Sequence, residues 1–224
     1  MEAGNEIIYH YLKQLIPTRD ALLSQMEEES EKKNIPIIQL PSIQLISVLL
    51  QWKAPKHILE VGTAEGYSTI WMARSAPAAQ ITTIELNEER ARVAIDNFKA
   101  AQLDDRIHLI IGDATEGINP EELLGKPPID FLFIDAAKGQ YQRFFDHFFP
   151  WVEEGGLIVS DNVLLRGLVA KERVRHKIRT MVTNMKGYND MLARHPQLST
   201  AFVPLGDGLA LSVKRGGEDG FKKA

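Results

Sequence analysis

The sequence predicts one α/β domain, in which a seven-stranded, mostly parallel sheet carries helices on both faces and ends in an antiparallel hairpin. From residue 54 onward, short apolar runs alternate with helix-length amphipathic stretches, which is typical of parallel strands joined by helices. Near the end, two apolar stretches flank a Gly-Asp-Gly turn, which indicates the hairpin. The 224 residues suit a single domain, which is expected to consist of N-terminal helices (1–53), an α/β core (54–215) and a flexible tail (216–224).

The N-terminal region is expected to be helical. Residues 5–33 have an apolar face at helical spacing, and Pro17-Thr18 is expected to restart the helix. This face is formed by Ile7, Ile8, Tyr11, Leu12 and Leu15. Two prolines within residues 34–41 indicate an extended connection, after which Ser42 is expected to cap a helix that runs to Trp52.

The core is expected to contain five parallel strands and the hairpin. The parallel strands are HILEV (57–61), ITTIE (81–85), IHLII (107–111), IDFLFID (129–135) and GLIVS (156–160), and the hairpin strands are STAFVPL (199–205) and LALSVKR (209–215). Ligands of such sheets bind beyond the carboxyl ends of the parallel strands. Polar residues at those ends are therefore the candidates for a functional site.

Composition excludes several classes of protein. Hydrophobic residues at 44% and charged residues at 25% are globular values, which excludes disordered and fibrous chains. The absence of cysteine excludes disulfides, thiolate metal sites and cysteine nucleophiles, and it suits a reducing compartment. The N-terminus lacks a signal-peptide pattern, and no apolar run approaches the roughly 18 residues of a membrane span. We therefore expect a cytoplasmic protein without a membrane partner.

The first predicted strand runs into a glycine-containing turn, Glu60-Val-Gly62-Thr-Ala-Glu-Gly66-Tyr-Ser68. Gly62 and Gly66 allow a tight turn and bring the backbone against a ligand at a helix N-terminus. Ala64 stands where the dinucleotide fingerprint has its second glycine, and no lysine follows Gly66 as a Walker loop requires. The turn instead suits a ligand without phosphates, beside a carboxylate that can hold an amino group; a purely structural turn is the alternative.

Two further strand ends carry acidic residues. Glu85 lies about 20 residues downstream, where a carboxylate can accept both hydroxyls of a ribose. Gly112-Asp113-Ala114 ends the third strand, where an aspartate can accept from an adenine amino group or cap a helix. Glu85 alone is consistent with a solvated carboxylate at a strand end. Three strand ends in this order favour a site for S-adenosylmethionine (SAM).

The last two parallel strands predict a metal site. Asp135 ends the fourth strand and Asp161-Asn162 end the fifth, so three oxygen ligands can converge in an incomplete shell. Such a shell suits Mg²⁺, Mn²⁺ or Ca²⁺ rather than zinc. Lys138 follows Asp135 by three residues and is a candidate general base, because a nearby cation disfavours its charged form. Helix-capping aspartates and a surface lysine are the alternatives.

Together these residues resemble the cation-dependent class I O-methyltransferases, which include catechol and caffeoyl-CoA O-methyltransferases. The resemblance covers Ile35 to Val213 and is carried by LEVGTAEGYS, TTIELN, GDA, FIDAAKGQY and GGLIVSDNVLLRG. It implies a Rossmann-like SAM-methyltransferase fold, a homodimer, catalysis by Lys138 and Asp135, and Mg²⁺ or Mn²⁺ bound by Asp135, Asp161 and Asn162. It implies SAM contacts at Ile38, Glu60, Gly62, Thr63, Ser68, Glu85, Asp113, Ala114 and Asp135.

Departures from the plant members of that family bear on the substrate. Plant enzymes carry Asp-Glu-Gly-Gln where this chain has Pro41-Ser42-Ile43-Gln44, and they differ at Ala137 and at Arg166-Gly167, so a phenylpropanoid thioester is not expected. The segment from Glu31 to Ser68 resembles a bacterial branch that methylates 5-hydroxyuridine at the wobble position of tRNA. The C5 hydroxyl and C4 carbonyl of that base are adjacent, as are the oxygens of a catechol, so one cation can chelate both.

Charge supports an RNA partner, the anticodon loop of tRNA. Seven Lys or Arg and a single acid, Glu172, lie between Arg166 and Lys186. Apolar residues at helical spacing leave these basic residues on an outer face; the apolar set is Val174, Ile178, Met181, Val182 and Met185. RNA contacts are expected at Arg166, Lys171, Arg173 and Lys177. A solvated helix face is the alternative reading of the charges.

Three other functions compete with a tRNA methyltransferase. A small catechol-like substrate would keep the same chemistry, and a SAM-binding module without catalysis would have no need of the metal ligands. A nicotinamide oxidoreductase is disfavoured because the second fingerprint glycine is missing.

Overall fold

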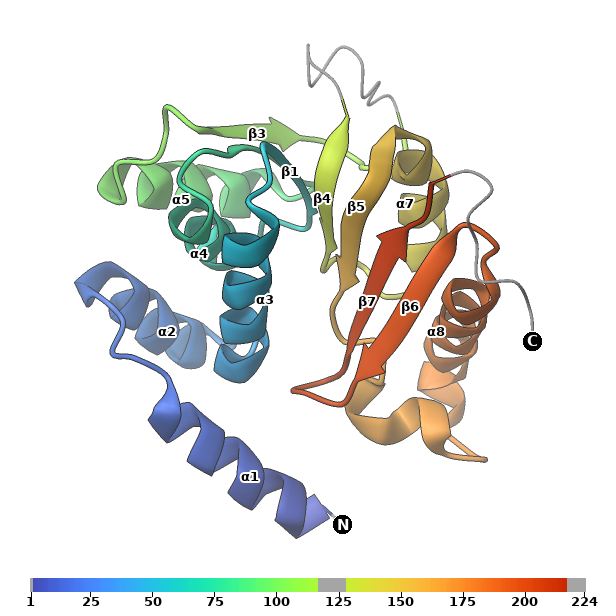
Figure 1. The fold of residues 1–224 in the computed structure, drawn as a ribbon. Helices are drawn as coiled ribbons and strands as arrows, with labels where there is room; N and C mark the ends of the chain where they lie inside the picture. Colours follow the sequence, from blue (N-terminus) through green and yellow to red (C-terminus); the bar gives the residue numbers. More distant parts are fainter. Residues whose placement is uncertain (1, 117–127, 217–224) are drawn as a thin grey trace.

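The computed structural model describes residues 2–116 and 128–216, with side chains from Ile7 onward. A seven-stranded sheet of order β3-β2-β1-β4-β5-β7-β6 forms its centre (Figure 1). The strands are β1 His57–Val61, β2 Gln80–Glu85, β3 Ile107–Ile111, β4 Ile129–Ile134, β5 Val152–Ser160, β6 Leu198–Val203 and β7 Leu209–Lys214. Strands β1 to β5 are parallel, and β7 pairs antiparallel with β5 and β6. The predicted sheet and its C-terminal hairpin are confirmed.

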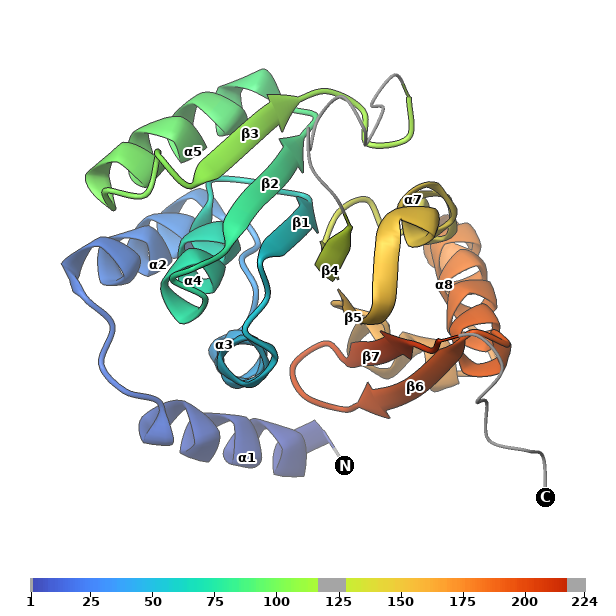
Figure 2. The same cartoon turned by 45° about the horizontal axis from the view of Figure 1, so that its top comes forward.

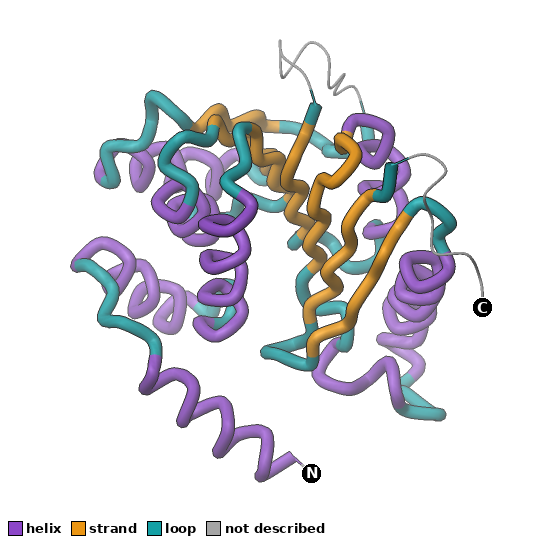
Figure 3. Tube along the Cα trace, in the orientation of Figure 1, coloured by secondary structure: helices purple, strands orange, loops and turns teal. Residues whose placement is uncertain are grey.

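Helices cover both faces of the sheet (Figures 2 and 3). They are α1 Glu2–Leu15, α2 Ala21–Lys33, α3 Leu40–Lys53, α4 Tyr67–Ser75, α5 Glu88–Ala100, α7 Tyr141–Phe148 and α8 His176–Arg194, with short 3₁₀ segments at Phe149–Trp151 and Leu165–Ala170. One apolar cluster packs α2 to α5 on one face, and a second packs α7 and α8 on the other. Because side chains alternate along a strand, Phe131 and Phe133 enter the first cluster while Leu132 and Ile134 enter the second.

The N-terminal helices begin elsewhere than expected. Helix α2 starts after Asp20, whose side chain accepts a hydrogen bond from the Leu23 amide at 3.0 Å, so Pro17-Thr18 belongs to the connection. Helix α3 starts at Leu40, and the expected cap at Ser42 was wrong. Ser42 is fully buried in the first turn, where its Oγ donates to the carbonyl of Leu205 at 3.5 Å.

The basic segment is not one helix. Arg166 and Gly167 adopt left-handed backbone angles (φ 53° and 80°) that interrupt the 3₁₀ segment, and α8 begins only at His176. Lys171 and Arg173 therefore precede the helix, and of the predicted apolar face Val182 and Met185 are buried. Strand β5 begins at Val152, four residues before the predicted start.

The predicted tail and the predicted absence of a membrane span can be compared with the described residues only. Gly216 is the last described residue, so the predicted tail otherwise lies outside the described residues. Within residues 2–116 and 128–216, no helix has the length and apolar character needed to cross a membrane.

Candidate active site

A cleft with a volume of about 720 Å³ lies beyond the carboxyl ends of the parallel strands. Its walls come from the loops after β1 to β5, from the segment before α3 and from the β6–β7 turn. Most predicted site residues line it: Ile38, Gly62, Thr63, Ser68, Glu85, Asp113, Ala114, Asp135, Lys138, Asp161, Asn162 and Arg166. The predicted cofactor, metal and base residues thus share one cleft, with one exception: Glu60, a predicted cofactor residue, does not line it.

The turn after β1 requires both of its predicted glycines. Gly62 has a φ of 103°, and a Cβ there would lie 2.1 Å from the carbonyl oxygen of Asp135. Gly66 has a φ of 89° at the N-cap of α4, and a Cβ there would lie 2.5 Å from the Phe98 ring. Only glycine adopts these angles at such close approach without strain. The turn therefore brings backbone directly against the cleft, as the sequence predicts.

Glu85 fastens this turn to the end of β2. Its side chain is buried, with Oε2 accepting from the Ala64 amide at 2.8 Å and Oε1 from the Asn87 amide at 2.9 Å. A carboxylate has about four acceptor positions, so two remain for a ligand in the cleft. Glu85 can therefore shape the turn and bind a ligand's hydroxyl groups together.

Glu60 differs from its predicted role as a direct cofactor contact. It is fully buried, and its carboxylate accepts hydrogen bonds from the hydroxyls of Ser68 (2.5 Å), Thr83 (2.6 Å) and Thr69. Burial raises the pKa of Glu60 to about 7, although these hydroxyls stabilise its charged form. Glu60 thus ties β1, β2 and the start of α4 together beneath the cleft.

Asp113 lies in the cleft wall after β3. Its Oδ1 accepts from both the amide and the hydroxyl of Thr115, each at 2.8 Å, and these hydrogen bonds lower the pKa of Asp113. The carboxylate is therefore charged and oriented, and Oδ2, to which no described residue donates, can accept from a donor such as an adenine amino group. The bond from the Thr115 amide is also the contact that a helix cap at Asp113 would make, while residues 117–127 lie outside the described residues.

The predicted metal ligands come together from β4 and β5. The Asp135 amide donates to Val61 and the Asp161 amide to Ile134, which aligns the two strand ends. Burial raises the pKa of both aspartates, and the charge of Asp135 raises the pKa of Asp161 further, while Lys138 opposes both shifts. A divalent cation would offset this repulsion, so the donors fit a hard metal ion.

Asn162 completes the donor set from a left-handed backbone conformation (φ 59°), and its amide donates to Asp161 Oδ1 at 2.6 Å. No group of three or more His, Cys, Asp or Glu side chains suited to a metal occurs in the parts of the chain that the structure describes. The predicted set of two carboxylates and one amide lines the cleft, and it stays a prediction as a metal site. Its incomplete shell leaves positions for substrate oxygens.

Asp207 is a cleft residue that sequence analysis missed. It lies in the β6–β7 turn, where its Oδ1 accepts from Gln39 Nε2 at 3.0 Å and its Oδ2 from Arg166 Nε at 3.2 Å. Gly206 and Gly208 flank it with positive φ angles, and the Gly-Asp-Gly pattern was the available signal. In the cleft wall, Asp207 thus joins the β6–β7 turn to the segment before α3 and to the segment after β5.

Residues 16–215 match the O-methyltransferase family. The chain belongs to this family. A catechol O-methyltransferase of Niastella koreensis is 30% identical over 216 residues, which cover 93% of this chain and 96% of that relative. A caffeoyl-CoA O-methyltransferase of Populus kitakamiensis is 28% identical, with 91% and 90% covered. The crystal structure of the Bacillus cereus O-methyltransferase in complex with SAH superimposes with a TM-score of 0.84 at 26% identity, covering 96% of this chain and all of that one.

This membership settles the reaction class and the cofactor. The protein is a SAM-dependent O-methyltransferase, and its sheet, closed by the β5-β7-β6 hairpin, is that of its structural neighbours. The cleft unites the turn after β1, Glu85 and Asp113 in the order expected for SAM. The roles of individual residues remain predictions, and so do the metal and the substrate.

Proposed function

We propose that the protein is a cytoplasmic, cation-dependent methyltransferase that converts 5-hydroxyuridine at the wobble position of tRNA to 5-methoxyuridine. The observation that carries this proposal is the position of Arg166, which belongs to the wall of the cleft while its side chain is 81% exposed. Lys171, Arg173 and Lys177 follow it along the chain and are exposed. A polyanion bound along these residues would pass the mouth of the cleft.

The chemistry rests on residues of one cleft. Asp135, Asp161 and Asn162 would hold Mg²⁺ or Mn²⁺, whose charge would supply the Lewis-acid effect that lowers the pKa of a substrate hydroxyl. Lys138 lines the same cleft and is available to remove the hydroxyl proton. The residues on the SAM side then contribute mainly position, since methyl transfer needs the oxygen and the sulfonium methyl in line.

Arg166 is held in a defined orientation for phosphate recognition. The Arg166 Nε donates to Asp207, and neither terminal nitrogen of Arg166 has a hydrogen-bond partner among the described residues, so both are left for a ligand. Guanidinium groups bind phosphate through two parallel hydrogen bonds. Contacts of this kind position an RNA strand, while the cleft selects the base. A wobble base that leaves the anticodon stack can enter such a cleft.

A small catechol-like molecule is the second candidate substrate. The Niastella koreensis relative is named a catechol O-methyltransferase, and Leu165, Leu168 and Met181 add apolar surface to the cleft wall. The metal and base chemistry would be the same. A SAM-binding module without catalysis is disfavoured, because family membership and the convergent Asp135, Lys138 and Asp161 both point to turnover.

We also propose that the protein forms a homodimer through α1 and the end of α3. Ile7, Ile8, Tyr11 and Leu15 expose more than half of their area on α1, and Trp52 is 80% exposed on α3. An apolar surface of this kind on a protein in water favours association. Light scattering of the wild type and of Tyr11→Glu should show a dimer and a monomer, respectively.

The substrate proposal is tested with two acceptors. The enzyme, SAM and Mg²⁺ are incubated with hydroxyuridine-containing tRNA and, separately, with a simple catechol, and methyl transfer is followed by mass spectrometry. We expect transfer to tRNA, whose affinity falls by about 0.7 log unit per log unit of salt for each single-strand phosphate contact. Reversing charge at Arg173 and Lys177 should weaken tRNA binding and spare SAM binding. Transfer to the catechol alone, at every salt concentration, would replace the tRNA proposal with the second candidate.

A further inference from the structure

The N-terminal part of the chain forms one wall of the SAM cleft. Pro36, Ile37, Ile38 and Gln39, which connect α2 to α3, line the cleft together with the turn after β1. Helix α2 precedes this connection, and its buried Leu23 and Met26 share an apolar cluster with residues of α4. The position of this wall therefore depends on how α2 is held against α4.

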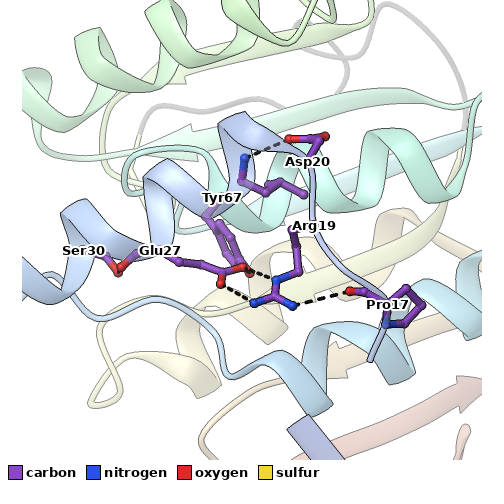
Figure 4. Close-up of polar contacts among 7 residues, drawn as sticks. Pro17, Arg19, Asp20, Glu27, Ser30 and Tyr67 are labelled. Carbon is purple, nitrogen blue, oxygen red and sulfur yellow. Dashed lines mark hydrogen bonds and ion pairs between the residues drawn. The ribbon is translucent and has the colours of Figure 1, made fainter. Parts of the chain in front are cut away.

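A partly buried polar contact joins these two helices (Figure 4). Arg19 donates through Nε and Nη2 to the two carboxylate oxygens of Glu27, at 2.9 and 2.8 Å. The Tyr67 hydroxyl donates to Glu27 Oε1 at 2.8 Å. The Arg19 and Glu27 side chains are only 18% and 19% exposed, so solvent screens this arrangement less than a surface ion pair. We call these three residues the α2–α4 latch.

Tyr67 connects the latch to the cofactor site. It is the first residue of α4, directly after Gly66, and it lines the cleft although only 3% of its area is exposed. Burial and the contact with Glu27 raise the pKa of Tyr67, so its hydroxyl stays a donor. A displacement of Glu27 would be transmitted through Tyr67 to the turn that faces SAM.

Further contacts fasten α2 at both ends. At its N-terminus, Asp20 forms an ion pair with Arg74 of α4. At its C-terminus, Lys33 lies 4.0 Å from Glu65, which belongs to the turn after β1 and lines the cleft. Helix α2 is thus tied to the last turn of α4 through Arg74 and to the turn before α4 through Glu65, with the α2–α4 latch between these two contacts.

We propose that Arg19 and Glu27 are positioning residues for the cofactor: through Tyr67 they hold the N-terminal wall against bound SAM and slow its release. Neither residue lines the cleft, so their effect on SAM is indirect. The proposal does not depend on which substrate is methylated.

The test compares Glu27→Ala with Glu28→Ala, a matched control on the same helix. Among the residues that the structure describes, Glu28 pairs only with Lys32, at 3.6 Å, and both side chains are more than 70% exposed. The affinity for SAM is measured by calorimetry, and the rate of SAM release is measured by stopped-flow fluorescence. The kcat is measured at saturating SAM. We expect Glu27→Ala to raise both the Kd and the release rate of SAM on the order of ten-fold, because the loss of one well-made hydrogen bond has an effect of about this size. The kcat at saturating SAM should be retained. Glu28→Ala should match the wild type.

Tyr67→Phe keeps the ring and removes only the hydroxyl, so it serves if Glu27→Ala folds poorly. It should raise the KM for SAM, and adding Glu27→Ala to it should give less than the sum of the two separate free-energy effects, since both act through one contact. The proposal is overturned if both variants lower the Tm but bind and release SAM as Glu28→Ala does. The latch would then stabilise the fold alone.

Discussion

Replacing Glu85 separates its two roles, in shaping the turn after β1 and in binding SAM. Its carboxylate accepts two backbone hydrogen bonds, from Ala64 and Asn87, and has two further acceptor positions for the ribose hydroxyls. Glu85→Ala removes all of these acceptors. Hydrogen bonds to charged groups contribute about 1.5–3 kcal/mol each, so losing one to the ribose should raise the Kd for SAM by roughly 10- to 150-fold.

The same variant leaves two backbone amides without their partner. An unsatisfied buried donor costs about 1–3 kcal/mol, and water entering the cleft would reduce this. Since 1 kcal/mol corresponds to about 2–4 °C for a chain of this size, we expect a Tm lower by several degrees in a protein that still folds. Calorimetric titration gives the Kd and scanning calorimetry without SAM gives the Tm.

Glu88→Ala is the matched control, because Glu88 is exposed and, in the described part of the chain, pairs only with Arg92 at 3.3 Å. It should leave both the Kd and the Tm unchanged. A lower Tm for Glu85→Ala with an unaltered Kd for SAM would refute the ribose contact and leave Glu85 as a residue that only shapes the turn.

Three further predictions concern the metal, the base and the buried carboxyl. Excess EDTA should abolish turnover and added Mg²⁺ or Mn²⁺ should restore it, while calorimetry should still detect SAM binding in EDTA. The Asp161→Ala variant should behave like the chelated enzyme. Full turnover in EDTA would exclude a metal mechanism. Lys138→Ala should lower kcat by about 10²–10⁴-fold with little change in the substrate KM, whereas a change confined to KM would make Lys138 a binding residue. Because the pKa of Glu60 is raised to about 7 from an ordinary 4.5, its contribution to stability is complete below pH 4.5 and is lost as the pH rises through 7, by about 3 kcal/mol. Glu60→Gln should therefore gain stability relative to the wild type between pH 5 and pH 8 in urea unfolding, and parallel pH profiles would contradict this.

The strands, and the site residues at the ends of the strands, could be predicted from the sequence because the strands are buried. All residues of β1 and β4 are buried, so each strand appears in the sequence as a continuous apolar run. Parallel strands place all their carboxyl ends at one edge, which is why Glu85, Asp135 and Asp161 could be assigned to one cleft.

The departures arise from contacts between distant residues. Ser42 has the chemistry of a helix cap, but the β6–β7 turn buries it inside the first turn of α3. Glu60 is paired in register with Thr83 and Phe133, on the sheet face that packs against α4, and the motif does not reveal that orientation. Asp207 contacts Gln39 across 168 positions, a contact that local sequence does not indicate.

The two signs of charge in this protein occupy different places, which the net charge of −4 does not show. The described residues lining the cleft include six acids (Glu65, Glu85, Asp113, Asp135, Asp161 and Asp207) but only three basic residues (Arg90, Lys138 and Arg166). An excess of carboxylates favours positive ligands, and both the sulfonium of SAM and a divalent cation are positive. SAH has lost the sulfonium charge, so the same carboxylates attract it less, which favours product release after methyl transfer. The exposed Lys171, Arg173 and Lys177 lie outside the cleft, where they can attract a polyanion without repelling the cofactor.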